Sequence, residues 1–279
     1  MTRSDALVST AWLADSMGAP DLKVADATWF LPPMGRDARQ EYREAHIPGA
    51  VYFDIDDIAD TASDLPHMVP DAAKFSSRVR DLGLGDGTRI VLYDNNRYSA
   101  SARAWWMFRL FGHNDVAVLD GGLAKWRSEG RPVDDAEVNP SSAHFTARLN
   151  NLLLRDLEQM RANLMSKHEL VIDARSSGRF AGTESEPRAG LRSGHIPGSV
   201  CVPFLELIEA DGTLASQDVL RRRFADAGID QQPLATTCGS GVTACTLALA
   251  LYDIGRKEVA VYDGSWTEWG GRSDTPVET

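Results

Sequence analysis

The feature of this sequence that most limits its fold is an internal repeat. The segment 44–55, EAHIPGAVYFDI, returns at 193–204 as SGHIPGSVCVPF, and both copies contain His-Ile-Pro-Gly. A second pair follows in the same order, with VAVLDGGLAKW at 116–126 and VAVYDGSWTEW at 259–269. Ordered matches at similar spacing indicate a duplicated structural unit rather than coincidence.

The chain has 279 residues, which is enough for two units because domains typically contain about 100–150 residues. Between the copies lies a stretch that mixes Pro, Ser, Asn and charged residues, as linkers do. We therefore predict a first domain at residues 1–140, a linker at 141–160 and a second domain at 161–279.

Each half alternates short apolar runs with helical patterns. The run RIVLYD at 89–94 precedes SARAWWMFRLFG at 101–112, and PLATTC at 233–238 precedes TACTLALALYDIG at 243–255. Continuous apolar strands are typical of parallel sheets that are covered on both faces. The pattern predicts an α/β fold in which each domain is a mainly parallel sheet flanked by helices. Ligands then bind beyond the carboxyl ends of the strands.

Charge and composition exclude several classes of partner. A net charge of −11 and a pI near 5.0 argue against nucleic acid or an anionic membrane surface. The first residues lack the pattern of a secretory signal, and no run of eighteen apolar residues occurs. Three cysteines are too few for a disulfide framework. We expect a cytoplasmic protein without a membrane or nucleic-acid partner.

Cys238 follows a predicted strand and opens the loop CGSGVT, residues 238–243, before a predicted helix. Glycines allow positive φ, so that backbone N–H groups can point inward and form a cradle for anions. The positive end of the following helix adds to this effect, and both favour the nucleophilic thiolate. The repeat aligns Asp94 with Cys238, so the thiol is expected in the second domain alone. Cys201 and Cys245 stand in apolar surroundings, where we expect buried thiols.

Two other chemistries lack the residues that they need. A cysteine-dependent phosphatase requires an arginine six residues after its cysteine, and position 244 is alanine. A metal site is not expected either, because the sequence contains no Cys-x-x-Cys and no close pair of histidines.

The duplicated halves, the two His-Ile-Pro-Gly elements and CGSGVTA resemble the two-domain rhodanese family of sulfurtransferases over essentially the whole chain. The resemblance implies an enzyme that carries sulfur as a persulfide on Cys238 and needs no other cofactor. The acceptor would be a thiol, such as thioredoxin or a small thiol, or cyanide. The six-residue loop would bind the substrate, which adds Gly239, Gly241, Val242 and Thr243 to the candidate site.

The loop also bears on the sulfur donor. In members of the family that use thiosulfate, the two residues after the cysteine are typically basic, whereas here they are Gly239 and Ser240. This difference favours 3-mercaptopyruvate as the donor, with release of pyruvate. Two alternatives stay open: a thiosulfate sulfurtransferase, or a non-catalytic sulfur carrier or binding module.

The resemblance also assigns roles to residues outside the loop. Arg179 and Arg188 would hold the carboxylate and keto oxygens of the donor, a task that suits the planar guanidinium fork. We expect Glu184 and Glu186 to orient them, and the roles of Arg175 and Arg192 stay open.

A relay of Ser240, His67 and Asp56 would protonate the enolate that carbon–sulfur cleavage leaves, since a histidine near its ordinary pKa suits proton transfer. We expect His46 and His195 of the repeated elements to be structural.

Overall fold

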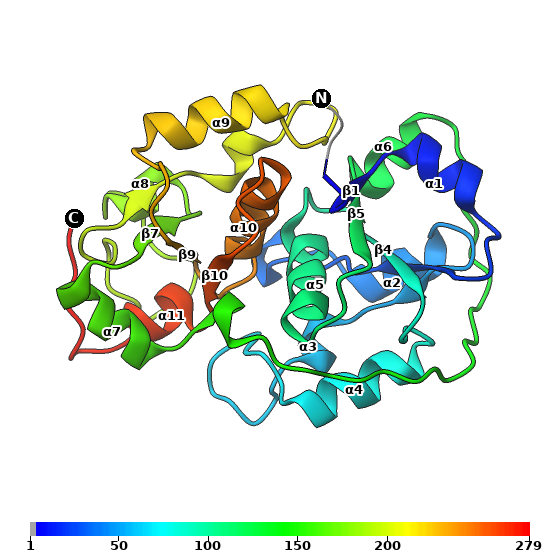
Figure 1. Cartoon of the computed structure of the whole chain (residues 1–279), viewed down its shortest axis with the longest axis horizontal. Coiled ribbons are helices and arrows are strands. Elements are labelled where there is room, and N and C mark those ends of the chain that lie inside the picture. The colour runs from blue at the N-terminus through cyan, green and yellow to red at the C-terminus, as the bar shows by residue number, and fades with distance from the viewer. Residues whose placement is uncertain (1–3) are drawn as a thin grey trace.

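The computed structural model describes residues 4–279, which form two α/β domains, each built on a five-stranded parallel sheet (Figure 1). The first sheet has the order β1-β5-β4-β2-β3 and comprises β1 (Leu7–Val8), β2 (Leu22–Asp26), β3 (Val51–Tyr52), β4 (Arg89–Tyr93) and β5 (Val116–Leu119). The second has the order β6-β10-β9-β7-β8 and comprises β6 (Leu154–Arg155), β7 (Leu170–Asp173), β8 (Val200–Cys201), β9 (Leu234–Thr237) and β10 (Val259–Tyr262). The identical order confirms the duplicated fold.

Helices cover both sheets. Those of the first domain are α1 (Thr10–Ser16), α2 (Ala38–Glu44), α3 (Ile55–Ile58), α4 (Ala72–Asp81), α5 (Ser99–Leu110) and α6 (Gly122–Ser128). Those of the second are α7 (Leu157–Ser166), α8 (Ser177–Phe180), α9 (Gln217–Asp226), α10 (Ala244–Asp253) and α11 (Ser265–Trp269). Within residues 4–279, no helix combines the length and apolar character needed to cross a bilayer.

The two domains share a core because α5 and α10 pack against each other (Figure 1). Every residue of α10 is buried, and so is nearly every residue of α5. A helix that is apolar on all sides needs cover on all sides, and here a sheet covers one side and the other domain covers the opposite side. The carboxyl ends of β4 and β9, and the loops that follow them, therefore face the same interdomain region.

The repeated His-Ile-Pro-Gly elements pair with the last segment of each domain. The backbone of His46 forms an antiparallel bridge with Asp134, and His195 forms the same bridge with Glu278. In both, the ring Nδ1 lies within 2.8 Å of a main-chain carbonyl oxygen. These contacts support the structural interpretation of the two histidines.

The expected linker, residues 141–160, has two parts. Up to residue 150 the chain has no helix or strand and runs along the first domain, where Phe145 is buried in the core and Arg148 N donates to Phe111 O at 2.8 Å. After that point β6 pairs with β10, and α7 begins at Leu157. The second sheet thus begins inside the range that the sequence indicated as linker.

A buried ion pair joins the domains. Arg103 of α5 and Asp263, which follows β10, lie 2.7 Å apart, and their side chains are 1% and 4% exposed. Arg103 also donates to the carbonyl oxygens of His67 at 2.5 Å and Gly241 at 3.3 Å. Asp263 accepts a hydrogen bond from Val69 N at 2.7 Å. Because a buried charge is stable only when it is paired and hydrogen-bonded, these contacts depend on one another.

Replacing this arginine tests the dependence. Arg103→Leu leaves the Asp263 carboxylate buried without its cation, so we expect the free energy of unfolding to fall by about 3–5 kcal/mol. Urea denaturation followed by circular dichroism measures the change. Arg109→Leu is the control, because Arg109 also lies on α5 but is only partly buried and stacks on Tyr252. Equal losses in both variants would contradict a special role for the ion pair.

Candidate functional site

The loop 238–243 lies where the sequence placed it, since β9 ends at Thr237 and α10 begins at Ala244. Cys238 is 2% exposed and lines a cavity of about 660 Å³ between the domains. The remaining loop residues Gly239, Ser240, Val242 and Thr243 line the same cavity. Gly241 instead faces Arg103 and Asp263 at the domain interface.

The start of α11 holds the first two loop residues in place. Cys238 N donates to Ser265 Oγ at 3.2 Å, and Cys238 O accepts from Trp266 N at 3.0 Å. Gly239 O accepts from Thr267 N at 2.8 Å and from Thr267 Oγ1 at 2.6 Å. The backbone around the thiol is therefore fixed on both sides by one neighbouring segment.

Glycine stands at positions 239 and 241 of the loop for two different physical reasons. Gly241 has φ +77°, and a Cβ there would lie 2.7 Å from Asp263 O, so both conformation and space require glycine. Gly239 does not have positive φ, which corrects the expectation that both glycines serve the backbone conformation. A Cβ at Gly239 would lie 3.1 Å from Arg179 Nη2 and 3.8 Å from Arg188 Nη1. Gly239 thus leaves room for two guanidinium groups beside Cys238.

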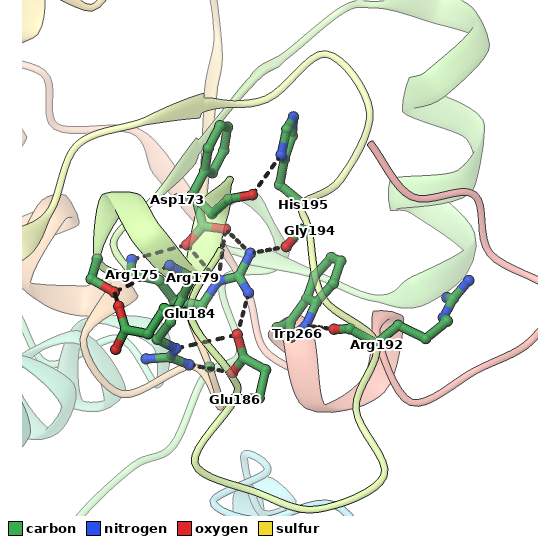
Figure 2. Close-up of polar contacts among 12 residues, drawn as sticks. Asp173, Arg175, Arg179, Glu184, Glu186, Arg192, Gly194, His195 and Trp266 are labelled. Atoms are coloured by element: carbon green, nitrogen blue, oxygen red, sulfur yellow. Dashed lines mark hydrogen bonds and ion pairs between the residues drawn. The ribbon is translucent and has the colours of Figure 1, made fainter. Parts of the chain in front are cut away.

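Glu186 lies between two arginines, as Figure 2 shows. It pairs with Arg179 of α8 at 2.5 Å and with Arg175 at 2.6 Å. Arg175 is 2% exposed and also pairs with Asp173 at 2.7 Å. Arg175 therefore lines the cavity with its charge neutralised by two carboxylates, while Glu186 holds Arg179, which lines the same cavity.

The other acidic and basic residues of this stretch have structural contacts. Glu184 Oε2 accepts a hydrogen bond from Ser176 Oγ at 2.6 Å and does not contact Arg188. Arg192 donates to Thr275 O at 2.8 Å and to Trp269 O at 2.9 Å. Arg192 thus fixes the C-terminal segment rather than the cavity.

Arg188 differs from these arginines because its guanidinium pairs with no carboxylate within residues 4–279. Its Nη2 lies 3.4 Å from His67 Nε2. Burial lowers the pKa of Arg188 below its ordinary value, although the nearby Cys238 sulfur and the Asp56 carboxylate oppose this shift. The cavity therefore contains one half-buried cation whose charge the protein does not neutralise directly.

His67 and Asp56 are brought together by the first domain. His67 Nδ1 lies 2.7 Å from Asp56 Oδ1, and Trp29 Nε1 donates to Asp56 Oδ2 at 2.8 Å. Burial alone would raise the pKa of Asp56, but the contacts with His67, Trp29 and Arg188 outweigh it and lower the pKa below its ordinary value. Asp56 is thus an anion that fixes the orientation of the imidazole.

The third member of the expected relay is less closely placed. Ser240 is 5% exposed and lines the cavity, but within residues 4–279 it forms no hydrogen bond with His67. His67 Nε2 faces Arg188 instead. The structure therefore contains the His67–Asp56 pair, and the complete relay stays a prediction.

The two remaining cysteines have thiols that resist ionisation. Burial raises the pKa of Cys245 to about 12 and that of Cys201 to about 11. Their sulfur atoms lie near the carbonyl oxygens of Gly241 and Arg175, respectively. Thiolate chemistry at neutral pH is thus not favoured at either position.

Several residues of the site were missed by the sequence reasoning. Trp29 and Arg103 act through contacts between distant segments, which a single sequence does not indicate. Asp263, Ser265 and Thr267 fall within the repeated segment 259–269, directly after a predicted strand. That position was an available signal, because loops at the carboxyl ends of parallel strands line ligand sites.

Both domains are similar to known proteins. The model of the rhodanese-like domain matches residues 9–129 and again residues 156–272. The chain belongs to the rhodanese family. Human 3-mercaptopyruvate sulfurtransferase is 45% identical over 95% of this chain and 91% of its own length. Rat thiosulfate sulfurtransferase is 48% identical over 98% of this chain and 94% of its own.

A solved structure supports the same assignment. The crystal structure of the 3-mercaptopyruvate sulfotransferase SseA from Escherichia coli superposes with a TM-score of 0.87 and 35% identity, and the match covers 94% of this chain and 99% of that one. The chain is therefore a sulfurtransferase of the rhodanese family. The names of its relatives divide between two sulfur donors, 3-mercaptopyruvate and thiosulfate.

The two loop glycines give a matched test. Gly241→Ala introduces a Cβ at positive φ and against Asp263 O, so we expect the free energy of unfolding to fall by roughly 1–3 kcal/mol, together with loss of sulfur transfer. Gly239→Ala should leave stability nearly unchanged but lower donor binding, because its Cβ displaces Arg179. Thermal denaturation and steady-state kinetics measure both effects. Similar melting temperatures for the two variants would contradict this assignment.

Proposed function

We propose that this sulfurtransferase uses 3-mercaptopyruvate as its donor and Cys238 as its sulfur carrier. The pairing of the arginines is the observation that carries the proposal. Arg175 and Arg179 are neutralised by carboxylates, whereas Arg188 is not. Beside Gly239 and Cys238, the cavity thus has a single unneutralised guanidinium, that of Arg188, which suits a donor with one carboxylate better than the thiosulfate dianion. Gly239, unlike a basic residue at this position, adds no positive charge to the cavity.

In the first half-reaction, the Cys238 thiolate attacks the sulfur of 3-mercaptopyruvate. A sulfur–sulfur bond forms, the carbon–sulfur bond breaks, and its electron pair leaves as the enolate of pyruvate. Arg188 and Arg179 hold the donor so that its sulfur faces Cys238, which replaces a bimolecular encounter by a fixed geometry. One proton added to the enolate carbon completes pyruvate and leaves Cys238 as a persulfide.

His67 is the proposed source of that proton. Asp56 is ionised and lies 2.7 Å from Nδ1, so it stabilises the protonated imidazole and leaves Nε2 facing Arg188. Ser240 would pass the proton from this nitrogen to the substrate, which requires that Arg188 move toward the donor and away from His67. In the second half-reaction, a thiol or cyanide takes the outer sulfur and regenerates Cys238.

Thiosulfate is the second candidate donor, since the thiosulfate sulfurtransferase of rat is as similar to this chain as the mercaptopyruvate enzymes are. A non-catalytic carrier or binding module is a third possibility, which the presence of Cys238 disfavours. All three cysteines are free, which is compatible with the cytoplasm, the compartment that we propose.

Intact-mass measurement tests the carrier and the donor together. We expect 3-mercaptopyruvate to add one sulfur atom to the protein and to release pyruvate, with kcat/KM at least about a hundredfold above that for thiosulfate, or about 2.7 kcal/mol. Cys238→Ser should add no sulfur, whereas Cys201→Ser should behave as the unchanged protein because burial keeps that thiol protonated. Preference for thiosulfate, or sulfur on another cysteine, would refute the proposal.

Arginine replacement tests the binding of the donor carboxylate. Arg188→Ala removes a charged hydrogen bond, so we expect kcat/KM for 3-mercaptopyruvate to fall by roughly tenfold to a thousandfold, or about 1.4–4 kcal/mol, with little change in melting temperature. Arg192→Ala is the matched control: it should lower the melting temperature, because Arg192 ties down the C-terminal segment, and affect the kinetics less. The reverse pattern would show that the two roles are assigned wrongly.

A further inference from the structure

Arg97 is a cation of the cavity to which the proposed reaction gives no task. It lies on the loop between β4 and α5, is exposed, and lines the same cavity as Cys238. Its guanidinium forms no ion pair or hydrogen bond with the described residues 4–279. Arg36 lines the same cavity but is neutralised by Glu41 at 2.5 Å. In a protein of net charge −11, the cavity therefore has an unneutralised positive charge contributed by the first domain.

The backbone at Arg97 is unusual for a residue with a side chain. Its φ is 53° and that of Tyr98 is 62°, in the left-handed region that favours glycine. Counted from the strand end, Arg97 stands where the second domain has Gly241, whose φ is 77°. Arg97 thus has a backbone conformation that suits glycine, and its side chain forms no hydrogen bond or ion pair with residues 4–279. This combination indicates that the side chain has a function, such as binding a ligand.

The neighbours of Arg97 hold this conformation. Asp94 Oδ1 accepts from Asn96 N at 2.9 Å and from Tyr98 N at 3.2 Å. The Tyr98 hydroxyl in turn accepts from Gly121 N at 3.1 Å. Arg97 is thus carried on a fixed loop, so its guanidinium does not have to order the backbone when it binds a ligand.

We infer that Arg97 binds the carboxylate of an anionic thiol acceptor and so selects which thiol receives the sulfur. The inference rests on the proposed function of the cavity. The proposed donor is a three-carbon acid, and Arg188 and Arg179, which would hold its carboxylate, lie beside Gly239. A cavity of about 660 Å³ is in the range that holds much larger ligands, so it has room for a longer thiol whose carboxylate extends to the Arg97 side.

The transfer that Arg97 would favour balances without a further reagent. The acceptor thiolate attacks the outer sulfur of the persulfide, and a new sulfur–sulfur bond forms on the acceptor. The bond to Cys238 Sγ breaks, and Cys238 leaves as the thiolate. Because Arg97 touches the acceptor alone, it should change the second half-reaction and not the formation of the persulfide.

The experiment measures the two half-reactions separately. The protein is first loaded with sulfur, by 3-mercaptopyruvate or, if that fails, by thiosulfate, and then mixed with glutathione, glutathione diethyl ester or 2-mercaptoethanol. For Arg97→Glu we expect the rate constant with glutathione to fall at least about tenfold, and those with the two thiols that lack a carboxylate to change less than about twofold. Arg97→Lys should retain most of the rate with glutathione.

Two controls separate charge from loop structure. Arg127→Glu makes the same charge change at an exposed position on α6 and should leave all three rates unchanged. Arg97→Gly relieves the positive φ, so its melting temperature should not fall, while its rate with glutathione should. Equal losses with all three thiols, or no loss with glutathione, would overturn the inference. Failure of the donor proposal would appear in the loading step instead.

Discussion

One buried cation links the domain interface to the candidate site. Arg103 reaches from the first domain to the Asp263 carboxylate, the carbonyl oxygen of His67 and that of Gly241. These groups belong to the domain interface, the proposed proton relay and the candidate catalytic loop. Because a guanidinium has several donors in fixed directions, it holds all three in one geometry. Interdomain packing and site geometry are therefore coupled, and a change in one is expected to alter the other.

The duplication explains why a single half carries the proposed nucleophile. At the position of Cys238, the first domain has Asp94, whose Oδ2 accepts hydrogen bonds from Ser101 N at 2.8 Å and Ser101 Oγ at 2.7 Å and whose Oδ1 binds two further backbone N–H groups. The carboxylate thus occupies the same kind of N–H cradle that an anionic ligand would use. In the first domain, the side chain of Asp94 itself fills the cradle, and the loop serves to position neighbouring residues.

The sequence was sufficient to predict the features that leave a repeated or periodic pattern, such as the two domains, the parallel sheets and the position of Cys238 at the end of a strand. Without the family resemblance it could not separate Arg175 and Arg192 from Arg179 and Arg188, because several carboxylates lie close to these arginines in the sequence and only the folded chain shows that Arg175 pairs with Asp173 and that Arg192 binds the C-terminal segment. The sequence also could not show why glycine is needed at positions 239 and 241, because the reason depends on the atoms that lie beside each Cα in the folded protein. Strands β1 and β6 are two residues long, too short to leave a pattern, and are placed by pairing with β5 and β10.

The cavity shows how a duplicated fold can divide a reaction between its halves. The second domain contributes Cys238 and the arginines beside Gly239, whereas the first contributes Trp29 and Arg97 to the wall and His67 behind Arg188. In the proposed reaction, substitutions on the first domain change proton supply or acceptor choice without disturbing the backbone that α11 fixes around the thiol. Arg103 helps to hold the two domains in a fixed relative position. Specificity can therefore vary in one domain while the chemistry of sulfur transfer stays in the other.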